Sequence, residues 1–191
     1  MTYIIRPAAT LFVTAVFTIA ALSVVYNYTL EPIQINERRK QEAAMRAVLP
    51  QATDFQSKQT SLSGTMVAVY QGFDNGTLVG HVVSLSPKGY DGNIDIMVGI
   101  CAADERITGM RIVQHTETPG LGALAARPDF YRRFDNRPLI PLTVVRTSPG
   151  EHDIATITAS TITTRAITNA VNEAMEWYLA AAAQAGGGGG R

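Results

Sequence analysis

The side chains best suited to chemistry in this sequence are the hydroxyls gathered between Asp153 and Ala166. Thr158, Ser160 and Thr161 stand at the start of a helix-forming stretch, and two more threonines follow. A helix N-terminus presents unpaired N–H groups and a partial positive charge, which together bind phosphate. A threonine hydroxyl at that point can be esterified to such a phosphate. The alternative is helix capping by the same hydroxyls, which the residue types alone favour.

Two further segments carry residues of turns and ligand-binding loops. The first is Glu117-Thr118-Pro119-Gly120-Leu121-Gly122, where proline followed by glycine predicts a type II turn. Glycines also let the backbone approach a ligand closely. The second is Lys88-Gly89-Tyr90-Asp91-Gly92, a loop before an alternating strand. Its tyrosine either stacks near an aromatic ligand or packs in the core, and the sequence leaves both readings open.

These three segments resemble the FMN-binding domain found in the G subunit of the Rnf complex and in the C subunit of the sodium-pumping NADH:quinone reductase. In that family a Ser/Thr-Gly-Ala-Thr core, one apolar residue and a further Ser/Thr follow an acidic residue. The last Thr of the core carries FMN through a phosphoester bond. When this sequence is aligned with the family pattern, the residue that carries FMN is Thr161. The first core residue is Thr158, and the acidic residue is Asp153. Thr163 or Thr164 takes the position that follows.

The resemblance spans about residues 66–179 and implies a covalent FMN site but no catalytic residue and no metal ligand. An electron relay needs no acid, base or nucleophile, because the cofactor carries the redox chemistry. The residues that we expect to bind the flavin are Thr161 (covalently), Thr158, Ser160, Thr164, Thr118, Gly120, Leu121 and Tyr90.

The chain departs from the family pattern at two positions of the core. Ala159 stands where the family has glycine, and Ser160 stands where it has alanine. If the backbone at Ala159 has positive φ, its Cβ carries a steric cost that glycine does not. This departure motivates an alternative function, a membrane-anchored scaffold domain without flavin.

The elements that must position these residues predict an α+β fold. Alternating apolar residues and turn signals predict strands at 66–70, 78–85, 94–100, 107–115 and 142–145. Asp74-Asn75-Gly76 predicts a hairpin turn, and 51–63 is predicted to be irregular. A short helix is expected near Phe130 and Phe134. The last helix has an apolar stripe that includes Ile162, Ile167 and Val171.

The N-terminal segment is predicted to be a transmembrane helix. Residues 7–30 contain no charged side chain, and a helix of this length spans about 36 Å, more than the hydrocarbon core of a bilayer. A cleaved signal peptide is the alternative, but the apolar run is too long for one. The predicted division is a tail and membrane helix at 1–30, a juxtamembrane helix and linker at 31–63, an FMN-binding domain at 64–180 and a flexible glycine-rich tail at 181–191.

Charge and cysteine content exclude several functions. The formal net charge is zero, so no basic surface for nucleic acid is indicated. One cysteine, Cys101, excludes an intramolecular disulfide and a multi-cysteine metal site. The three histidines are widely separated in the sequence, with no metal-ligand spacing. An electron carrier in this chain is therefore expected to be organic.

The charges that flank the span leave its orientation open. Arg38, Arg39 and Lys40 follow it and Arg6 precedes it, so the positive-inside rule by itself favours a cytoplasmic C-terminal domain. The resemblance implies the opposite, a flavin domain on the periplasmic side of the bacterial inner membrane, and we adopt that orientation on the resemblance.

The resemblance further implies an electron-transfer subunit of an ion-translocating ferredoxin:NAD oxidoreductase, the Rnf complex. Its partners are the other Rnf subunits, the lipid bilayer and a separate flavin transferase that uses FAD and magnesium. Chain length favours this reading over the C subunit of the sodium-translocating NADH:quinone reductase, which is usually longer.

Overall fold

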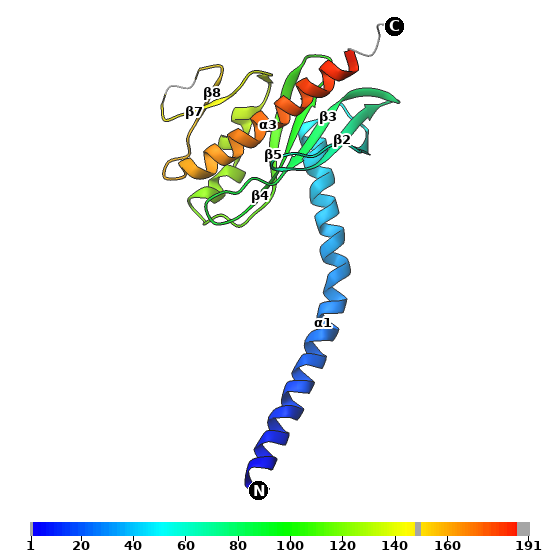
Figure 1. Ribbon diagram of the computed structural model, residues 1–191, viewed down its shortest axis with the longest axis vertical. Coiled ribbons are helices and arrows are strands. Elements are labelled where there is room, and N and C mark those ends of the chain that lie inside the picture. Colours follow the sequence, from blue (N-terminus) through cyan, green and yellow to red (C-terminus); the bar gives the residue numbers. More distant parts are fainter. Residues whose placement is uncertain (1, 148–149, 187–191) are drawn as a thin grey trace. The chain divides into compact units, whose positions relative to one another are not determined.

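The computed structural model describes residues 2–147 and 150–186, and within them the side chains of 5–26, 33–147 and 150–184. The chain forms two compact units, Met1–Gln41 and Glu42–Arg191. Helix α1 (Thr2–Val48) makes up nearly all of the first unit and begins the second. Figure 1 shows the ribbon of both units.

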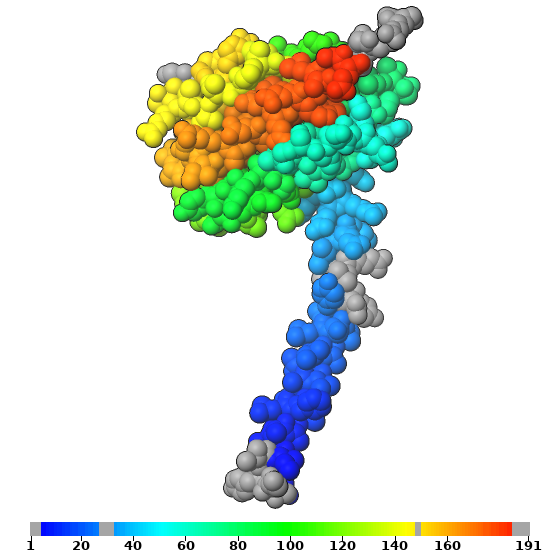
Figure 2. Space-filling view, viewed as in Figure 1, coloured from blue at the N-terminus to red at the C-terminus, as the bar shows by residue number. Residues whose placement is uncertain are grey.

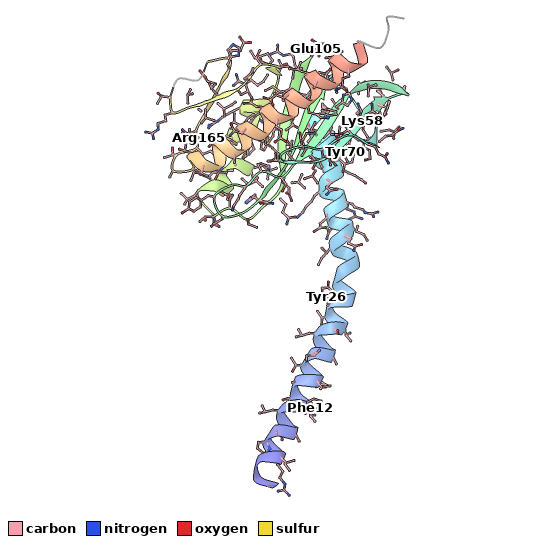
Figure 3. All side chains as sticks on the ribbon, in the orientation of Figure 1. Phe12, Tyr26, Lys58, Tyr70, Glu105 and Arg165 are labelled. Carbon is pink, nitrogen blue, oxygen red and sulfur yellow. The ribbon has the colours of Figure 1, made fainter. Side chains whose placement is uncertain are left out.

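The first unit is a single apolar helix. Ile5–Tyr26 has a mean hydropathy of 2.3, and among the described residues it is the helix long and apolar enough to cross a membrane. Its side chains are exposed, as Phe12 and Tyr26 illustrate in Figure 3. Helix α1 continues beyond this span without interruption to Val48 and ends before Pro50, which cannot continue a helix. The predicted membrane helix and the helix that follows it are therefore one element.

The second unit has an antiparallel sheet of strands joined in chain order, as predicted. The strands are β1 (Asp54–Lys58), β2 (Met66–Asp74), β3 (Thr77–Leu85), β4 (Ile94–Cys101), β5 (Arg106–His115) and β6 (Arg137–Pro138). β2 and β3 form the predicted hairpin, in which Asn75 and Gly76 both have positive φ (49° and 82°). Two-residue hairpin turns require this conformation.

One predicted loop is a strand, and one strand was missed. β1 lies within 51–63, so the prediction of an irregular segment there is wrong. Its residues pair with β2 at the sheet edge through backbone hydrogen bonds. Such pairing depends little on side-chain type, so the strand has no alternating apolar pattern from which it could be predicted. β7 (Thr143–Val145) matches the predicted strand, but its parallel partner β8 (Asp153–Ala155) was not predicted. A strand of three residues is too short for a periodic signal.

Short helical turns connect β5 to β6. They are η1 (Gly122–Ala126), α2 (Pro128–Tyr131) and η2 (Arg132–Phe134). Phe130 and Phe134 are buried and meet edge to face, with ring centroids 5.5 Å apart. The helix expected near these two residues is therefore present, as one α-helical turn that tightens into a 3₁₀ turn.

The sheet has a hydrophobic core on each face. On one face, alternate residues such as Val83, Ile96 and Val98 pack with buried side chains of helix α3 (Thr161–Gly186). On the other face, Val82 and Met97 pack with the end of α1, where Val48 and Leu49 are fully buried. Successive residues of a strand point to opposite faces, which explains the alternation.

Helix α3 is the longest element of the second unit and covers one face of the sheet. Figures 1 and 2 show it running across the unit, flanked by the segment after residue 138 and by the sheet strands. Ile167 and Val171 are fully buried, but Ile162 is 56% exposed and does not belong to the predicted stripe. Thr163 and Thr164 take the buried positions of the first turn instead. The helix extends to Gly186, so the flexible tail predicted from 181 is wrong for 181–186; residues 187–191 lie outside the described part.

The turn before α3 has one strained residue. Ala159 has φ of 60°, in the left-handed region, and Ser160 N–H donates to Ile157 C=O across the turn. Ala159 therefore has the positive φ that was considered from the sequence. Its Cβ carries a steric cost in this conformation, which glycine adopts freely.

We predict that Ala159→Gly stabilises the protein by about 0.5–1 kcal/mol, because relief of the steric cost exceeds the extra chain entropy of glycine. Denaturant unfolding of the detergent-solubilised chain measures the change. Ala180→Gly is the matched control: Ala180 is exposed in α3, and glycine there lowers stability by about 1 kcal/mol. Equal destabilisation by both substitutions contradicts the prediction.

His81 is a buried histidine on β3 that packs edge to face on Trp177 and Tyr178, with ring centroids 5.6 and 5.7 Å away. Neither ring nitrogen has a hydrogen-bond partner. Burial, and then the charge of Lys58, lowers the pKa of His81 from 6.5 to about 4. The unfolded chain therefore binds a proton more readily than the folded chain does between these two values.

We predict that His81 alone lowers the free energy of unfolding by about 2 kcal/mol between pH 7 and pH 5. The contribution is fully present above pH 6.5 and is lost as the pH falls towards 4, because the unfolded state is protonated first. Thermal unfolding of wild type and His81→Phe across this range measures it. The phenylalanine variant should have the shallower pH dependence, and parallel curves would show that His81 contributes nothing.

Candidate functional site

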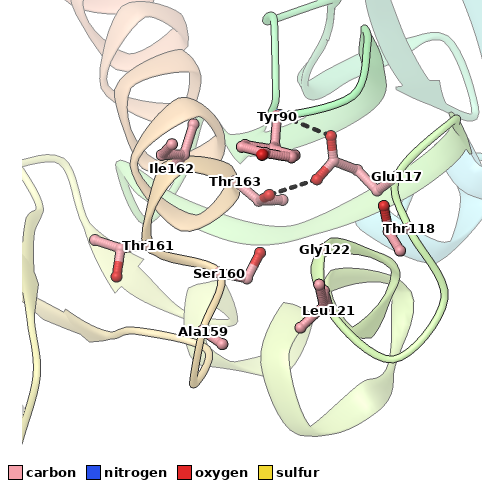
Figure 4. A pocket seen from close by; sticks show the side chains of 10 residues that line it. All are labelled: Tyr90, Glu117, Thr118, Leu121, Gly122, Ala159, Ser160, Thr161, Ile162 and Thr163. Atoms are coloured by element: carbon pink, nitrogen blue, oxygen red, sulfur yellow. Dashed lines mark hydrogen bonds between the residues drawn. The ribbon is translucent and has the colours of Figure 1, made fainter.

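A cavity lies where the start of α3 meets two loops of the sheet. Its volume is about 410 Å³, within the range of small-molecule sites. Figure 4 shows its lining residues, which come from the three segments singled out in the sequence. They are Tyr90, Glu117, Thr118, Leu121, Gly122, Ala159, Ser160, Thr161, Ile162 and Thr163.

The start of α3 brings three hydroxyls to this cavity. The first bond within the helix runs from Thr164 N–H to Ser160 C=O, at 3.1 Å. The N–H groups of residues 161–163 therefore have no carbonyl of the helix as acceptor. Ser160 and Thr163 are buried, whereas Thr161 is half-buried. In Figure 4, Ser160 and Thr163 point towards the Glu117 side and Thr161 projects from the other side of the helix start.

The structure does not support the capping alternative for these hydroxyls. Within the described residues, no helix N–H donates to the side chain of Thr158, Ser160 or Thr161. The hydroxyl that organises the turn is that of Thr164, which accepts from Ile157 N–H at 3.2 Å and donates to Ser160 C=O at 2.9 Å. Thr163 donates to Glu117, so the cavity hydroxyls left for a ligand are those of Ser160 and Thr161.

Three of the predicted flavin-binding residues do not line the cavity. Thr164 is fully buried in the core, because the turn uses its hydroxyl. Gly120 is exposed, has φ of 80° and serves the turn itself. Thr158 borders a neighbouring hollow of about 220 Å³ that is also lined by Arg127 and Arg133. The other predicted residues, which are Thr161, Ser160, Thr118, Leu121 and Tyr90, do line it.

Apolar side chains surround the mouth of the cavity. Tyr90, Leu121 and Ile162 are 69%, 42% and 56% exposed, although all three are large. Tyr90 is therefore not a core residue, which was one of the two readings left open. Thr118 donates a hydrogen bond to the Asp91 carboxylate and so joins the two loops that carry Leu121 and Tyr90. An aromatic ligand would find an apolar surface here on each side.

Sequence reasoning missed the residue that connects these segments, Glu117. It is only 5% exposed, and its carboxylate accepts hydrogen bonds from the loop at Tyr90 and from Thr163 on α3. The signal was present in the sequence, since a carboxylate stood at the head of a glycine-rich turn. A glutamate in a loop is usually solvated, so its residue type alone did not indicate burial.

Two charged residues of the motif lie outside the cavity lining. Asp153 is in β8, where hydrogen bonds from Thr143 Oγ1 and then Gly150 N–H lower the pKa of its carboxyl below the usual value. Arg165 is exposed on α3, as Figure 3 shows. Among the described residues, no group of three or more His, Cys, Asp or Glu side chains is placed to bind a metal ion.

Comparison with known proteins adds sequence evidence to this geometry. Residues 89–176 match the family model of the FMN-binding domain. The matched range contains the turn at Glu117, the start of α3 and most of the loop at Tyr90. All three cavity-forming segments are therefore part of the family's domain.

Two curated relatives match over nearly their whole length. The chain is 31% identical to the G subunit of the ion-translocating oxidoreductase complex of Methanosarcina acetivorans, over 93% of this chain and 95% of the relative. It is 34% identical to the G subunit of the Na(+)-translocating ferredoxin:NAD(+) oxidoreductase complex of Acetobacterium woodii, over 88% of each chain. Both matches therefore extend well beyond the 88 residues of the FMN-binding domain match.

A solved structure supports the fold. The C subunit of the Na(+)-translocating NADH-quinone reductase from Parabacteroides distasonis superimposes with a TM-score of 0.59 over 78% of this chain and 95% of that one. At 15% identity the likeness concerns the fold alone. The α+β architecture expected from the sequence is thus confirmed. The two relatives show that this chain belongs to the family of G subunits of Rnf-type ion-translocating oxidoreductase complexes.

Proposed function

We propose that this chain is the membrane-anchored flavoprotein subunit of an Rnf-type complex and relays electrons through FMN esterified to Thr161. The observation that carries the proposal is the position of Thr161 in the first turn of α3, at the rim of the cavity. The relatives from ion-translocating oxidoreductase complexes and the FMN-binding domain match support it.

The residues around the cavity fit FMN by size and chemistry. Free N–H groups at the start of α3 suit a phosphate, and Thr161 of the same turn lines the cavity. The exposed side chains of Tyr90, Leu121 and Ile162 suit the flat apolar ring system. The buried hydroxyl of Ser160 supplies a polar group inside. Bound FMN supplies the one- and two-electron chemistry, and these side chains hold it in place.

Attachment of FMN follows a balanced phosphoryl transfer from FAD. The Thr161 oxygen forms a bond to the phosphorus of the FMN half, and the bond from that phosphorus to the bridging oxygen of the pyrophosphate breaks. AMP leaves, and the hydroxyl proton passes to solvent. Because Thr161 is half-buried and lies on the opposite side of the helix start from Glu117, a separate transferase can reach it.

The rest of the chain holds the flavin domain at the membrane. Ile5–Tyr26 would cross the bilayer, and the helix continues into the FMN-binding domain, for which we propose the bounds 64–180. We place this domain on the periplasmic side, where its partners are the other Rnf subunits. The C subunit of the quinone reductase is the second candidate, supported only by the shared fold.

We predict that Thr161→Val abolishes covalent FMN, because valine has the shape of threonine without the attacking oxygen. The full chain is coexpressed with a flavin transferase, and flavin fluorescence is read in a denaturing gel. Thr161→Ser should keep part of the signal, since its hydroxyl remains. Thr156→Val removes a nearby hydroxyl outside the cavity and should leave loading unchanged. A fluorescent Thr161→Val band would contradict the assignment.

The orientation predicts labelling from the periplasmic side. Thr77→Cys places a thiol at the exposed first position of β3, beside the hairpin turn, whereas the native Cys101 is only 4% exposed. A membrane-impermeant maleimide should label this variant in intact spheroplasts and leave wild type unlabelled. Labelling that requires lysis would place the domain in the cytoplasm, as the flanking charges favour.

A further inference from the structure

A single buried carboxylate joins the three segments that form the cavity. Glu117 Oε1 accepts hydrogen bonds from the N–H groups of Tyr90 (2.8 Å) and Asp91 (3.0 Å). Its other oxygen, Oε2, accepts from Thr163 Oγ1 on α3 at 2.5 Å. Two of these bonds are drawn in Figure 4. The loop, the turn that carries Glu117 and the helix start are therefore held together at one point.

The two glycines beside this carboxylate exist because it fills their side-chain space. A Cβ on Gly89 would collide with Glu117 Oε1, and a Cβ on Gly122 would collide with Oε2. Neither glycine is among the residues with positive φ, so the backbone conformation does not require them. Close packing around the carboxylate requires glycine at both positions. The same packing encloses Glu117 on the sides that the hydrogen bonds leave open.

Among the described residues, the charge of this carboxylate has no counter-ion. The ion pair formed among the described residues is Arg111–Asp135, and Glu117 takes part in none. No Lys, Arg or His lines the cavity. Three donated hydrogen bonds compensate the burial of this group, but they do not cancel the field of a negative charge. The cavity wall therefore carries one uncompensated negative charge.

We propose that Glu117 is the positioning residue of the flavin cavity and that its negative charge holds the reduction potential of bound FMN low. The inference rests on the proposed function, because it requires FMN in this cavity. A fixed negative charge in a partly enclosed site disfavours added electrons on a nearby ring system. The same three hydrogen bonds that shape the cavity also hold this charge at its wall.

The Glu117→Gln substitution removes the negative charge of the side chain and keeps its shape. The amide oxygen accepts from Tyr90 and Asp91 as before, and the amide nitrogen donates to Thr163 Oγ1, which then acts as acceptor. We expect the variant to retain covalent FMN and to have a more positive reduction potential than wild type. At the wild-type midpoint the ratio of reduced to oxidised FMN should rise at least tenfold, or about 30 mV for a two-electron couple.

Glu173→Gln is the matched control, since Glu173 holds a loop in the same way. Its carboxylate accepts from Thr65 N–H at 2.8 Å and from Thr65 Oγ1 at 2.7 Å, beside Gly64, whose Cβ would collide with it. It lies on α3 about 18 Å along the helix from Thr161. This variant should change the thermal stability but not the reduction potential.

The measurement is a spectroscopic redox titration at one pH of the detergent-solubilised full chains, coexpressed with the transferase. Equal potentials of wild type and Glu117→Gln would overturn the inference, as would an equal shift in Glu173→Gln. Glu117→Ala should reduce covalent loading at least tenfold relative to Glu117→Gln, and loading at the wild-type level would overturn the positioning role.

Thermal unfolding shows whether Glu117→Ala folds. If it does not, the potentials of the two glutamine variants decide the proposal. A wild-type chain without FMN contradicts the proposed function, whereas loaded chains with equal potentials contradict only this inference.

Discussion

The burial of α3 on the sheet is the constraint on which the rest of the structure depends. Ile167, Val171 and Ala174 are fully buried, and they fix both the axial position and the rotation of the helix. Asn172 adds a polar clamp, since its amide accepts from and donates to the backbone of Leu142, each at 2.9 Å. The first turn of α3 therefore cannot slide, and Thr161 is held at the rim of the cavity.

Packing alone does not shape the cavity, because the two loops opposite α3 have little core of their own. Glu117 supplies the missing connection through donors on the loop and on the helix. The arrangement costs the burial of a charge, which is tolerated because every bond it makes comes from an N–H or O–H group. The same group that shapes the cavity also gives it a negative wall, so geometry and electrostatics of the site have one origin.

Most of the fold was predictable from local patterns. Alternation in β3 and β4, the Asn75-Gly76 turn and the apolar stripe of α3 each determine an element within a few residues. Strands β1 and β8 were not predictable from local patterns, because β1 is a polar edge strand and β8 is three residues long. Ile162 was assigned to the wrong face because apolar character alone does not distinguish the core from the apolar mouth of a site.

The sequence by itself determined the long apolar N-terminal helix and the α+β class. It determined the family as well, through the motif at Thr161 and the turn that begins at Glu117. It also determined that Ala159 would be strained if its backbone turned left-handed. Only the tertiary structure decided which hydroxyls face the cavity and which serve the turn, as Ser160 and Thr164 illustrate. It alone revealed Glu117 as the common partner of two segments, one of which lies 46 residues from it in the sequence. Contacts between distant segments depend on how the helix packs on the sheet, and local sequence carries no record of that.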